Sequence, residues 1–316
     1  MVFVRKERKA VDNLGQEMEN KNACFDVGGQ ALIEGVMMRT PLRMALAVRK
    51  KNGDIALEVR NTRPLAKRNR FFGLPVIRGI VNLIDSLIVG WQALSYSASV
   101  AFEEEEEKLS NFDMGMAILL ALGLFVGLFV ALPTFLASLV DRFIVSTFLY
   151  NLVEGCIRVG IFLLYLAVIS SMKDIRRIFE YHGAEHKAIF TFENGEELKP
   201  ENAEKFTTFH PRCGTNWLII VMIVSIFVFS LLGRPGIVGR VITRVLVVPL
   251  VAGLAYEAIK LLSRYRDNKL VYWLSLPGLW LQRITTRSPD RSQLEVAFSA
   301  LKGSLGEKRN HVAGKS

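Results

Sequence analysis

MGMAILLALGLFVGLFVALPTFLASLV, the run of residues 114–140, contains no charged side chain. A bilayer core is about 30 Å thick, so a helix needs about 20 consecutive apolar residues to cross it. The run therefore predicts a membrane-spanning helix. The whole chain is 51% hydrophobic, has a mean hydropathy of +0.28 and is still 22% charged. These values exclude an ordinary soluble domain and require apolar and charged segments to alternate along the sequence.

Three more runs resemble spanning helices. Residues 148–171 are apolar except for a Glu and an Arg four positions apart, and residues 217–232 contain only hydroxyls as polar groups. Residues 237–262 are interrupted by the charged residues Arg240, Arg244 and Glu257, and Pro249 lies in the middle of the run. We therefore predict a mostly α-helical, polytopic bundle with four transmembrane helices in a membrane domain at residues 113–262.

The positions of the basic residues predict the topology. Of the 40 Lys and Arg residues, 17 precede Met114, 7 lie in the loop 172–215 and 10 follow Leu262, whereas the two remaining connections hold one each. By the positive-inside rule, the N-terminus, that loop and the C-terminus are cytoplasmic, and the protein resides in the cell membrane. The net positive charge of +10 is distributed along the chain as this topology requires. Because no recognised binding motif accompanies it, we exclude nucleic acid as a partner.

The segments outside the membrane domain have distinct compositions. Residues 1–24 form a polar, basic tail, and residues 263–316 form a cytoplasmic C-terminal region with an amphipathic helix around Gln293–Leu301. Within residues 25–70, two short apolar runs flank Asn52-Gly53, a dipeptide typical of hairpin turns. This pattern predicts a small cytoplasmic β element.

Residues 71–112 combine an amphipathic helix with an acidic linker. Apolar residues such as Ile77, Ile80 and Ile84 recur at helical spacing, while Arg78 and Asp85 occupy the opposite stripe. An amphipathic helix of this kind lies in the membrane interface or packs on the bundle from the cytoplasmic side. We therefore predict an interfacial helix here rather than a fifth span.

Tyr181-His182-Gly183-Ala184-Glu185-His186-Lys187 carries the strongest indication of chemistry. On a helix, His182 and His186 lie one turn apart on one face, so two imidazoles can bind one metal ion. Glu185 lies beside them, and His-x-x-Glu-His is the order found in inverted zinc peptidases. There, the Glu accepts a proton from a metal-bound water. The pattern predicts zinc or another divalent transition metal, with Glu185 as the catalytic base. Histidines near a membrane interface also serve as hydrogen-bonding anchors, which is the competing interpretation.

A third metal ligand is needed, and three residues are candidates. His210 and Cys213 stand three positions apart in HPRCGT, just before the third predicted span. Glu257 lies near the cytoplasmic end of the fourth span and could supply a carboxylate instead of pairing with a cation. Because the ligand set holds at most one Cys, it resembles a catalytic rather than a structural zinc site.

Two further groups of residues have functional and structural interpretations. In the glycine-rich stretch 28–39, GGQALIEGVMMR, the candidate site residues are Gln30, Glu34 and Arg39; the competing interpretation is a turn packed against the membrane helices. Charged residues inside the spans predict a structural ion-pair lock, with transport or lipid handling as the alternative. They are Glu154, Arg158, Arg240 and Arg244.

GGQALIEGVMMR, YHGAEHK, HPRCGT and QRITTRSP occur in this order along the chain. With these four motifs, residues 25–302 resemble the YqhQ-like family of uncharacterised bacterial membrane proteins. Members of that family are sometimes described as predicted metal-dependent enzymes. The resemblance implies that the motif residues form a family pattern, namely His182, Glu185, His186, His210 and Cys213.

The sequence thus favours a membrane-embedded, cytoplasm-facing, metal-dependent hydrolase, such as a zinc peptidase. The first alternative is a non-enzymatic membrane scaffold or assembly factor with a structural His/Cys cluster. The second alternative is a transporter or lipid-handling protein. The expected partners are the lipid bilayer and a membrane or cytoplasmic protein.

Overall fold

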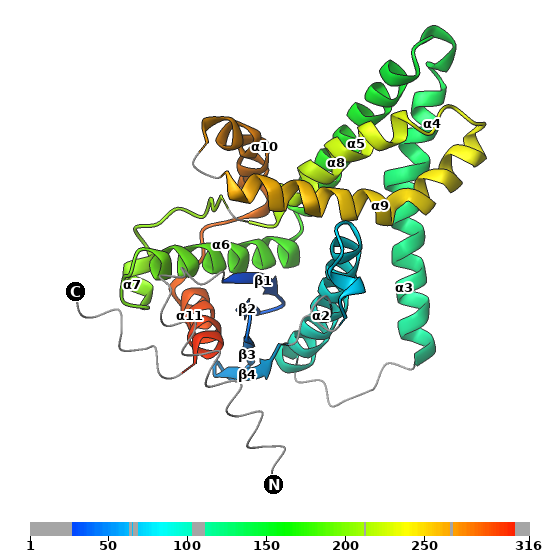
Figure 1. Ribbon diagram of the computed structural model, residues 1–316. Coiled ribbons are helices and arrows are strands. Elements are labelled where there is room, and N and C mark those ends of the chain that lie inside the picture. The colour runs from blue at the N-terminus through cyan, green and yellow to red at the C-terminus, as the bar shows by residue number, and fades with distance from the viewer. Residues whose placement is uncertain are drawn as a thin grey trace.

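A computed structural model describes residues 27–62, 65, 69–102, 111–211, 213–265 and 268–306. The basic tail 1–24 and the acidic linker 103–110 lie outside the described residues. Figure 1 shows a unit built around a small sheet, with long helices extending away from it.

The sheet has four antiparallel strands in the order β1-β2-β3-β4. They are β1 (Gly28–Leu32), β2 (Gly35–Arg39), β3 (Arg43–Arg49) and β4 (Ile55–Asn61). The predicted hairpin at Asn52-Gly53 joins β3 to β4 and is confirmed. The glycine-rich stretch 28–39 is a second hairpin, β1–β2, and not the turn predicted for it. The connection between β1 and β2 contains Glu34. Its φ of 51° lies in the left-handed region, where Gly or Asn is more usual.

Helices cover both faces of this sheet (Figure 1). On one face, Val36 and Met38 pack against α6 (Lys173–Glu193) and α11 (Arg291–Leu305). On the other face, Leu46 and its neighbours pack against α2 (Ile77–Phe102). Strands buried on both faces need continuous apolar runs rather than alternating ones. The sequences GVMMR and RMALAVR of β2 and β3 meet this requirement.

Gly53 allows a test of the hairpin. Its φ of +91° lies in a region that L-residues rarely adopt. We expect Gly53→Ala to lower the free energy of unfolding by about 1 kcal/mol, because alanine strains that backbone. Gly28→Ala is the matched control, since a Cβ at Gly28 meets nothing within 4 Å. The measurement is thermal unfolding in detergent. Equal unfolding midpoints for the two variants would contradict a strained backbone at Gly53.

Within the described part of the chain, four helical segments are long and apolar enough to cross a membrane. They are α2 (Ile77–Phe102), the stretch Gly115–Ser138, α5 (Thr147–Ile169) and Ile237–Leu262 of α9 (Ile237–Arg264). The stretch Gly115–Ser138 combines α3 (Asn111–Val126), the π-helical turn η3 (Gly127–Ala131) and α4 (Leu132–Ser138). Three of these segments coincide with predicted spans.

The fourth segment differs from the prediction. The run 217–232 forms α8 (Thr215–Ser230), whose 16 residues reach only about 24 Å. In contrast, α2 has 26 residues and the hydropathy of a spanning helix, although it was predicted to lie in the interface.

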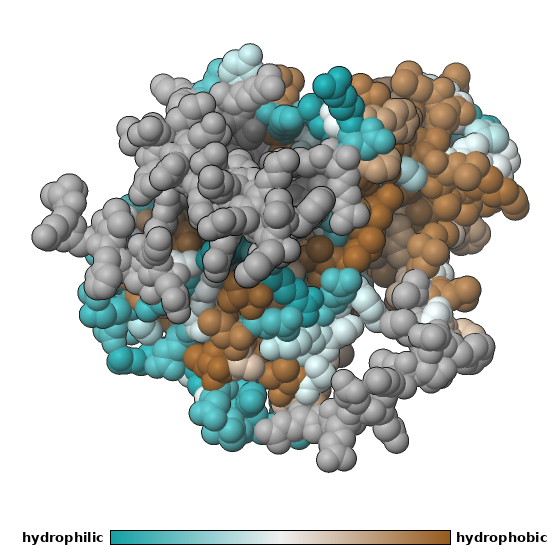
Figure 2. Space-filling view, turned by 60° about the horizontal axis from the view of Figure 1, so that its bottom comes forward, coloured by the Kyte–Doolittle hydropathy of each residue, from teal (hydrophilic) through white to brown (hydrophobic). Residues whose placement is uncertain are grey.

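The apolar surface of the protein lies mainly on these long helices. Leu119, Leu120 and Leu124 of α3 are each about two-thirds exposed. Figure 2 shows hydrophobic residues gathered on one side of the molecule and hydrophilic residues on the other. Large exposed apolar surfaces are rare on soluble monomers and fit contact with lipid.

The C-terminal region contains two helices. The predicted amphipathic helix is α11, and its N-terminus has a capping box formed by Asp290 and Gln293. Before it, α10 (Lys269–Thr285) packs against α8; the sequence did not predict this helix. The remaining short elements are η2 (Phe71–Gly73), η4 (Asp141–Phe143) and α7 (Pro200–Ala203).

Candidate metal centre

Three of the predicted ligands, His182, His186 and Cys213, come together at α6. The helix continues unbroken through the His-x-x-Glu-His pattern, so His182 and His186 project from one face, with ring centroids 4.4 Å apart. Cys213, which precedes α8, brings Sγ to 3.2 Å from Nε2 of His182. One ligand atom from each of the three residues lies within 4.8 Å of the others. Atoms that share one zinc ion are about 3 to 4 Å apart, so this group has suitable dimensions.

Backbone carbonyls orient both imidazole rings. Nδ1 of His182 lies 2.8 Å from the carbonyl oxygen of Thr285, and Nδ1 of His186 lies 2.5 Å from that of Thr208. A carbonyl oxygen only accepts hydrogen bonds, so each Nδ1 carries the proton. Each Nε2 is then left with a lone pair. A second group that fixes the tautomer in this way is typical of metal-ligating histidines.

The surroundings of His186 Nε2 show whether these residues fit a metal ion. His186 is 1% exposed, and its Nε2 is buried without a hydrogen-bond partner among the described residues. Burial also lowers the pKa of His186, which favours the neutral imidazole that metals bind. Cys213 Sγ accepts hydrogen bonds from the backbone N–H and the hydroxyl of Thr215, at 3.5 and 3.4 Å. The donor set fits a divalent transition metal.

Glu185 lies between this cluster and the sheet. It is 6% exposed, and its carboxylate accepts a hydrogen bond from the backbone N–H of Gly29. Burial raises the pKa of Glu185 to about 7, although His182 and the Gly29 N–H oppose this increase. A Cβ at position 29 would lie 2.7 Å from the carboxylate, so only glycine allows β1 to approach so closely. This contact explains the second glycine of the Gly-Gly pair.

Gly183 allows another segment to cross α6. A Cβ added there would lie closer than 3.0 Å to the carbonyl oxygen of Arg287. The crossing is fixed by the Arg287 N–H, which donates to the carbonyl oxygen of Phe179 at 2.9 Å. Since Thr285 of the same segment orients His182, the QRITTRSP motif holds the site together. All four sequence motifs therefore meet at one place.

The structure places His210 beside the cluster rather than in it. Its Nε2 lies 3.4 Å from a carboxylate oxygen of Glu193, and its ring centroid is 5.6 Å from that of His186. Its backbone N–H and C=O both bond the side chain of Gln282, at 2.7 and 2.9 Å. Of the two predicted ligands in HPRCGT, Cys213 joins the two histidines.

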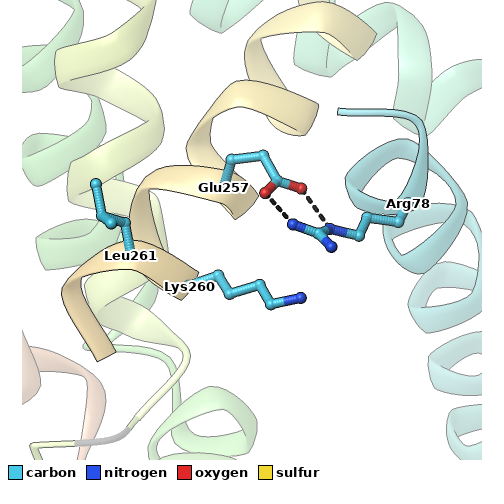
Figure 3. Close-up of a pocket in the computed structure, with 4 residues that line it drawn as sticks. All are labelled: Arg78, Glu257, Lys260 and Leu261. Carbon is cyan, nitrogen blue, oxygen red and sulfur yellow. Dashed lines mark hydrogen bonds and ion pairs between the residues drawn. The ribbon is translucent and has the colours of Figure 1, made fainter. Parts of the chain in front are cut away.

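Glu257 occupies a different position again. Its carboxylate pairs with the guanidinium of Arg78, and one oxygen accepts the backbone N–H of Val76 at 3.3 Å. Figure 3 shows this pair facing across a shallow hollow, with Lys260 one turn further along α9. Glu257 thus anchors the start of α2. It pairs with a cation, which was the alternative to its predicted role as a metal ligand.

The three candidates in the stretch 28–39 do not share one site. Glu34 binds the guanidinium of Arg177 and accepts from the Tyr181 hydroxyl at 3.2 Å, so it joins the β1–β2 connection to α6. Arg39 pairs with Asp85 of α2 at 3.0 Å, and the Gln30 amide packs on Gly90 of α2. Gln30 and Arg39 therefore face away from Glu185.

The structure also identifies supporting residues that were not predicted to have this role. Thr208 and Thr285 orient the two imidazoles through their backbone carbonyls, and the buried Gln282 amide holds the backbone of His210. Gln282 and Thr285 belong to the QRITTRSP motif, whereas Thr208 lies in none of the four motifs, because a contact through a backbone atom leaves little trace in residue type.

The chain is similar to uncharacterised proteins. The family described as "Protein of unknown function (DUF1385)" matches residues 74–307. The "Uncharacterized protein YqhQ" of Bacillus subtilis (strain 168) is 32% identical over 286 residues, which cover 86% of this chain and 90% of that protein. No solved structure matches. With a family match over most of its length and this similarity to YqhQ, the chain belongs to the YqhQ-like family of proteins of unknown function, DUF1385.

Proposed function

We propose that this protein is a membrane-embedded, metal-dependent hydrolase whose active site faces the cytoplasm. His182, His186 and Cys213 would hold a zinc ion or another divalent transition metal. The observation that carries the proposal is the unsatisfied Nε2 of His186 beside two further ligand atoms within 4.8 Å. A buried polar nitrogen without a partner costs free energy that binding a metal ion would recover.

Zinc would supply Lewis acidity and lower the pKa of a bound water. The chain's own residues supply the rest. Thr285 and Thr208 hold both imidazoles in the ligating tautomer. Glu185 projects from the same helix but is not part of the ligand group, so its carboxylate is available to hold a proton. The Gly29 N–H keeps that carboxylate in place. This division of roles fits peptide or amide hydrolysis.

The proposed topology follows the charge distribution. The N-terminus, the segment with α6 and the C-terminus would be cytoplasmic. The four predicted spans, which correspond to Gly115–Ser138, α5, α8 and α9, would lie in the cell membrane, and α2, which packs on the sheet, would lie on its cytoplasmic side. The sheet, α6 and α11 form one packed unit, so all of its parts must lie on the same side of the bilayer. The placement of Lys and Arg residues supports the cytoplasmic side.

Metal analysis of the purified protein tests the proposal. We expect about one zinc ion per chain, and we expect His182→Ala, His186→Ala and Cys213→Ser each to reduce it below about one tenth. The matched control is His210→Gln, which alters a neighbouring buried histidine outside the ligand group and should retain the metal. Sub-stoichiometric zinc that does not change when His182 and His186 become alanine would refute the proposal.

A second candidate function is a non-enzymatic scaffold or assembly factor. It is favoured by one observation, which is that Glu185 accepts the Gly29 N–H at the edge of the sheet. There, β1 has no further strand beside it among the described residues. Unpaired strand edges favour aggregation, so a buried carboxylate that satisfies one has a structural use. In this case the His/Cys cluster would hold α6 and α8 together for a partner protein to bind.

A further inference from the structure

A buried ionic cluster lies at the opposite end of α5, α8 and α9 from the candidate metal centre. Glu154 is 1% exposed and pairs with Arg158 at 2.8 Å and with Arg244. The predicted pairing of Glu154 with Arg158 is therefore confirmed. Nearer the end of the helices, Asp141 pairs with Arg240 at 2.7 Å and with Arg234 at 3.0 Å. Two arginines thus share each carboxylate.

This arginine cluster, defined as Arg158, Arg234, Arg240 and Arg244, has an excess of positive charge. Its four arginines stand against two carboxylates, Asp141 and Glu154. The aromatic rings of Tyr150 and Phe229 lie 4.8 to 5.3 Å from the guanidinium carbons of the four, but they carry no charge. Charges inside a membrane require an opposite charge nearby.

The cluster also has unused hydrogen-bond donors. Nε of Arg234 and Nε of Arg244 are buried without a partner among the described residues. Both hydrogen bonds of Arg244 come from Nη2, although its side chain is only 4% exposed. An anion with several acceptor oxygens, bound beside Arg234, would supply the missing negative charge and an acceptor for the Arg234 Nε.

The accessible edge of the cluster points to the kind of anion. The Asp141 and Arg234 side chains are 29% and 17% exposed, whereas those of Arg240 and Arg244 are below 10%. Apolar residues around this edge are strongly exposed, namely Val145 at 98%, Leu231 at 86% and Val238 at 72%. Arginine beside exposed aliphatic side chains is the composition expected where lipid headgroups meet acyl chains.

We propose that the arginine cluster binds a phosphate group, carried by an anionic lipid headgroup, at the membrane surface opposite the candidate metal centre. Guanidinium groups match phosphate oxygens through paired hydrogen bonds. Glu154 lies 15 residues before the end of α5, or about 22 Å along its axis. The candidate metal centre lies on α6, which follows that end of α5 along the chain, so the arginine cluster lies at the far end of α5 from it. The site depends on the membrane topology proposed above and not on the metal chemistry.

Lipid retention by the full-length protein tests this site. Detergent-purified protein mixed with equal amounts of phosphatidylglycerol and phosphatidylcholine would be examined by native mass spectrometry. We expect retained phosphatidylglycerol to exceed phosphatidylcholine, and we expect Arg234→Gln to reduce this preference about fivefold, because one interfacial cation is removed. Arg142→Gln, at the same end but stacked only on Phe143, should leave it unchanged. Equal retention of both lipids by the wild type, or an unchanged preference in Arg234→Gln, overturns the lipid site.

Glu154→Gln keeps the test decisive if Arg234→Gln folds poorly. The variant removes a negative charge from the cluster, so the preference for phosphatidylglycerol should rise several-fold. A cluster that only locks helices together would lose thermal stability with no change in lipid preference, and that result argues against the site. A lipid-free sample is also tested with inorganic phosphate. If phosphate raises the thermal stability and phosphatidylglycerol does not, the site binds a free anion and the lipid proposal is wrong.

Discussion

Gly183→Ala is expected to lower the free energy of unfolding by about 3 kcal/mol or more, although alanine is the better helix former by about 1 kcal/mol. The new Cβ would overlap the carbonyl oxygen of Arg287, which belongs to the segment crossing α6. Neither backbone can move freely, because the Arg287 N–H is bonded to Phe179. Since the same segment orients His182, zinc content should fall together with stability. Thermal unfolding in detergent and metal analysis measure both effects.

Gly160→Ala is the matched control for this substitution. Gly160 also lies inside a helix, α5, but an added Cβ there meets nothing within 4 Å. We expect its thermal midpoint to stay the same or rise. If Gly183→Ala is as stable as Gly160→Ala, the close crossing of the two segments does not exist in the protein.

Glu185→Gln is expected to abolish hydrolysis while leaving the fold and the metal in place. The glutamine carbonyl can still accept the Gly29 N–H, but the side chain cannot take up a proton. Loss of a general base reduces rates by about 10²- to 10⁴-fold. The measurement is the release of new N-termini from a peptide library by zinc-loaded protein, followed by mass spectrometry. Zinc content of the variant, measured in parallel, should equal that of the wild type.

Glu193→Gln provides the control on the same helix. Glu193 contacts His210 and lies outside the ligand group, so its replacement should leave cleavage intact. If Glu185→Gln supports full function in cells that depend on this protein, the hydrolase proposal is wrong and the scaffold is favoured. Glu185→Ala would then lose function through stability alone, because the Gly29 N–H would have no acceptor.

Several features could be predicted because they depend on local sequence. Asn52-Gly53 defines a hairpin, and apolar runs of bilayer length define long apolar helices. The spacing of His182 and His186 places both on one helix face. In each case, neighbouring residues alone determine the geometry.

The choice of the third ligand could not be predicted, because it depends on distant contacts. His210 and Cys213 are close in sequence and chemically plausible as ligands. Gln282, 72 residues further on, holds the backbone of His210 and leaves its ring beside Glu193. Hydrogen bonds over such sequence separations leave no periodic pattern.

The partners of the polar stripe on α2 could not be predicted, for a related reason. Its polar stripe contains Arg78 and Asp85, which suggested contact with water. In the structure, Arg78 pairs with Glu257 and Asp85 pairs with Arg39, so both charges contact protein. Sequence periodicity shows that a helix has two faces but not what each face contacts.

The meeting of four distant motifs at one site has a consequence for biosynthesis. Gly29 contacts Glu185, while Thr285 contacts His182, so the centre needs nearly the whole chain. At translation rates of about 5 to 20 residues per second, the first hairpin waits roughly 10 to 50 seconds for its last partner. During that interval β1 lacks α6 for most of the time, and its free edge is open to wrong pairing. Nascent chains that stall before α10 is synthesised are therefore expected to bind chaperones and to be degraded by quality-control proteases.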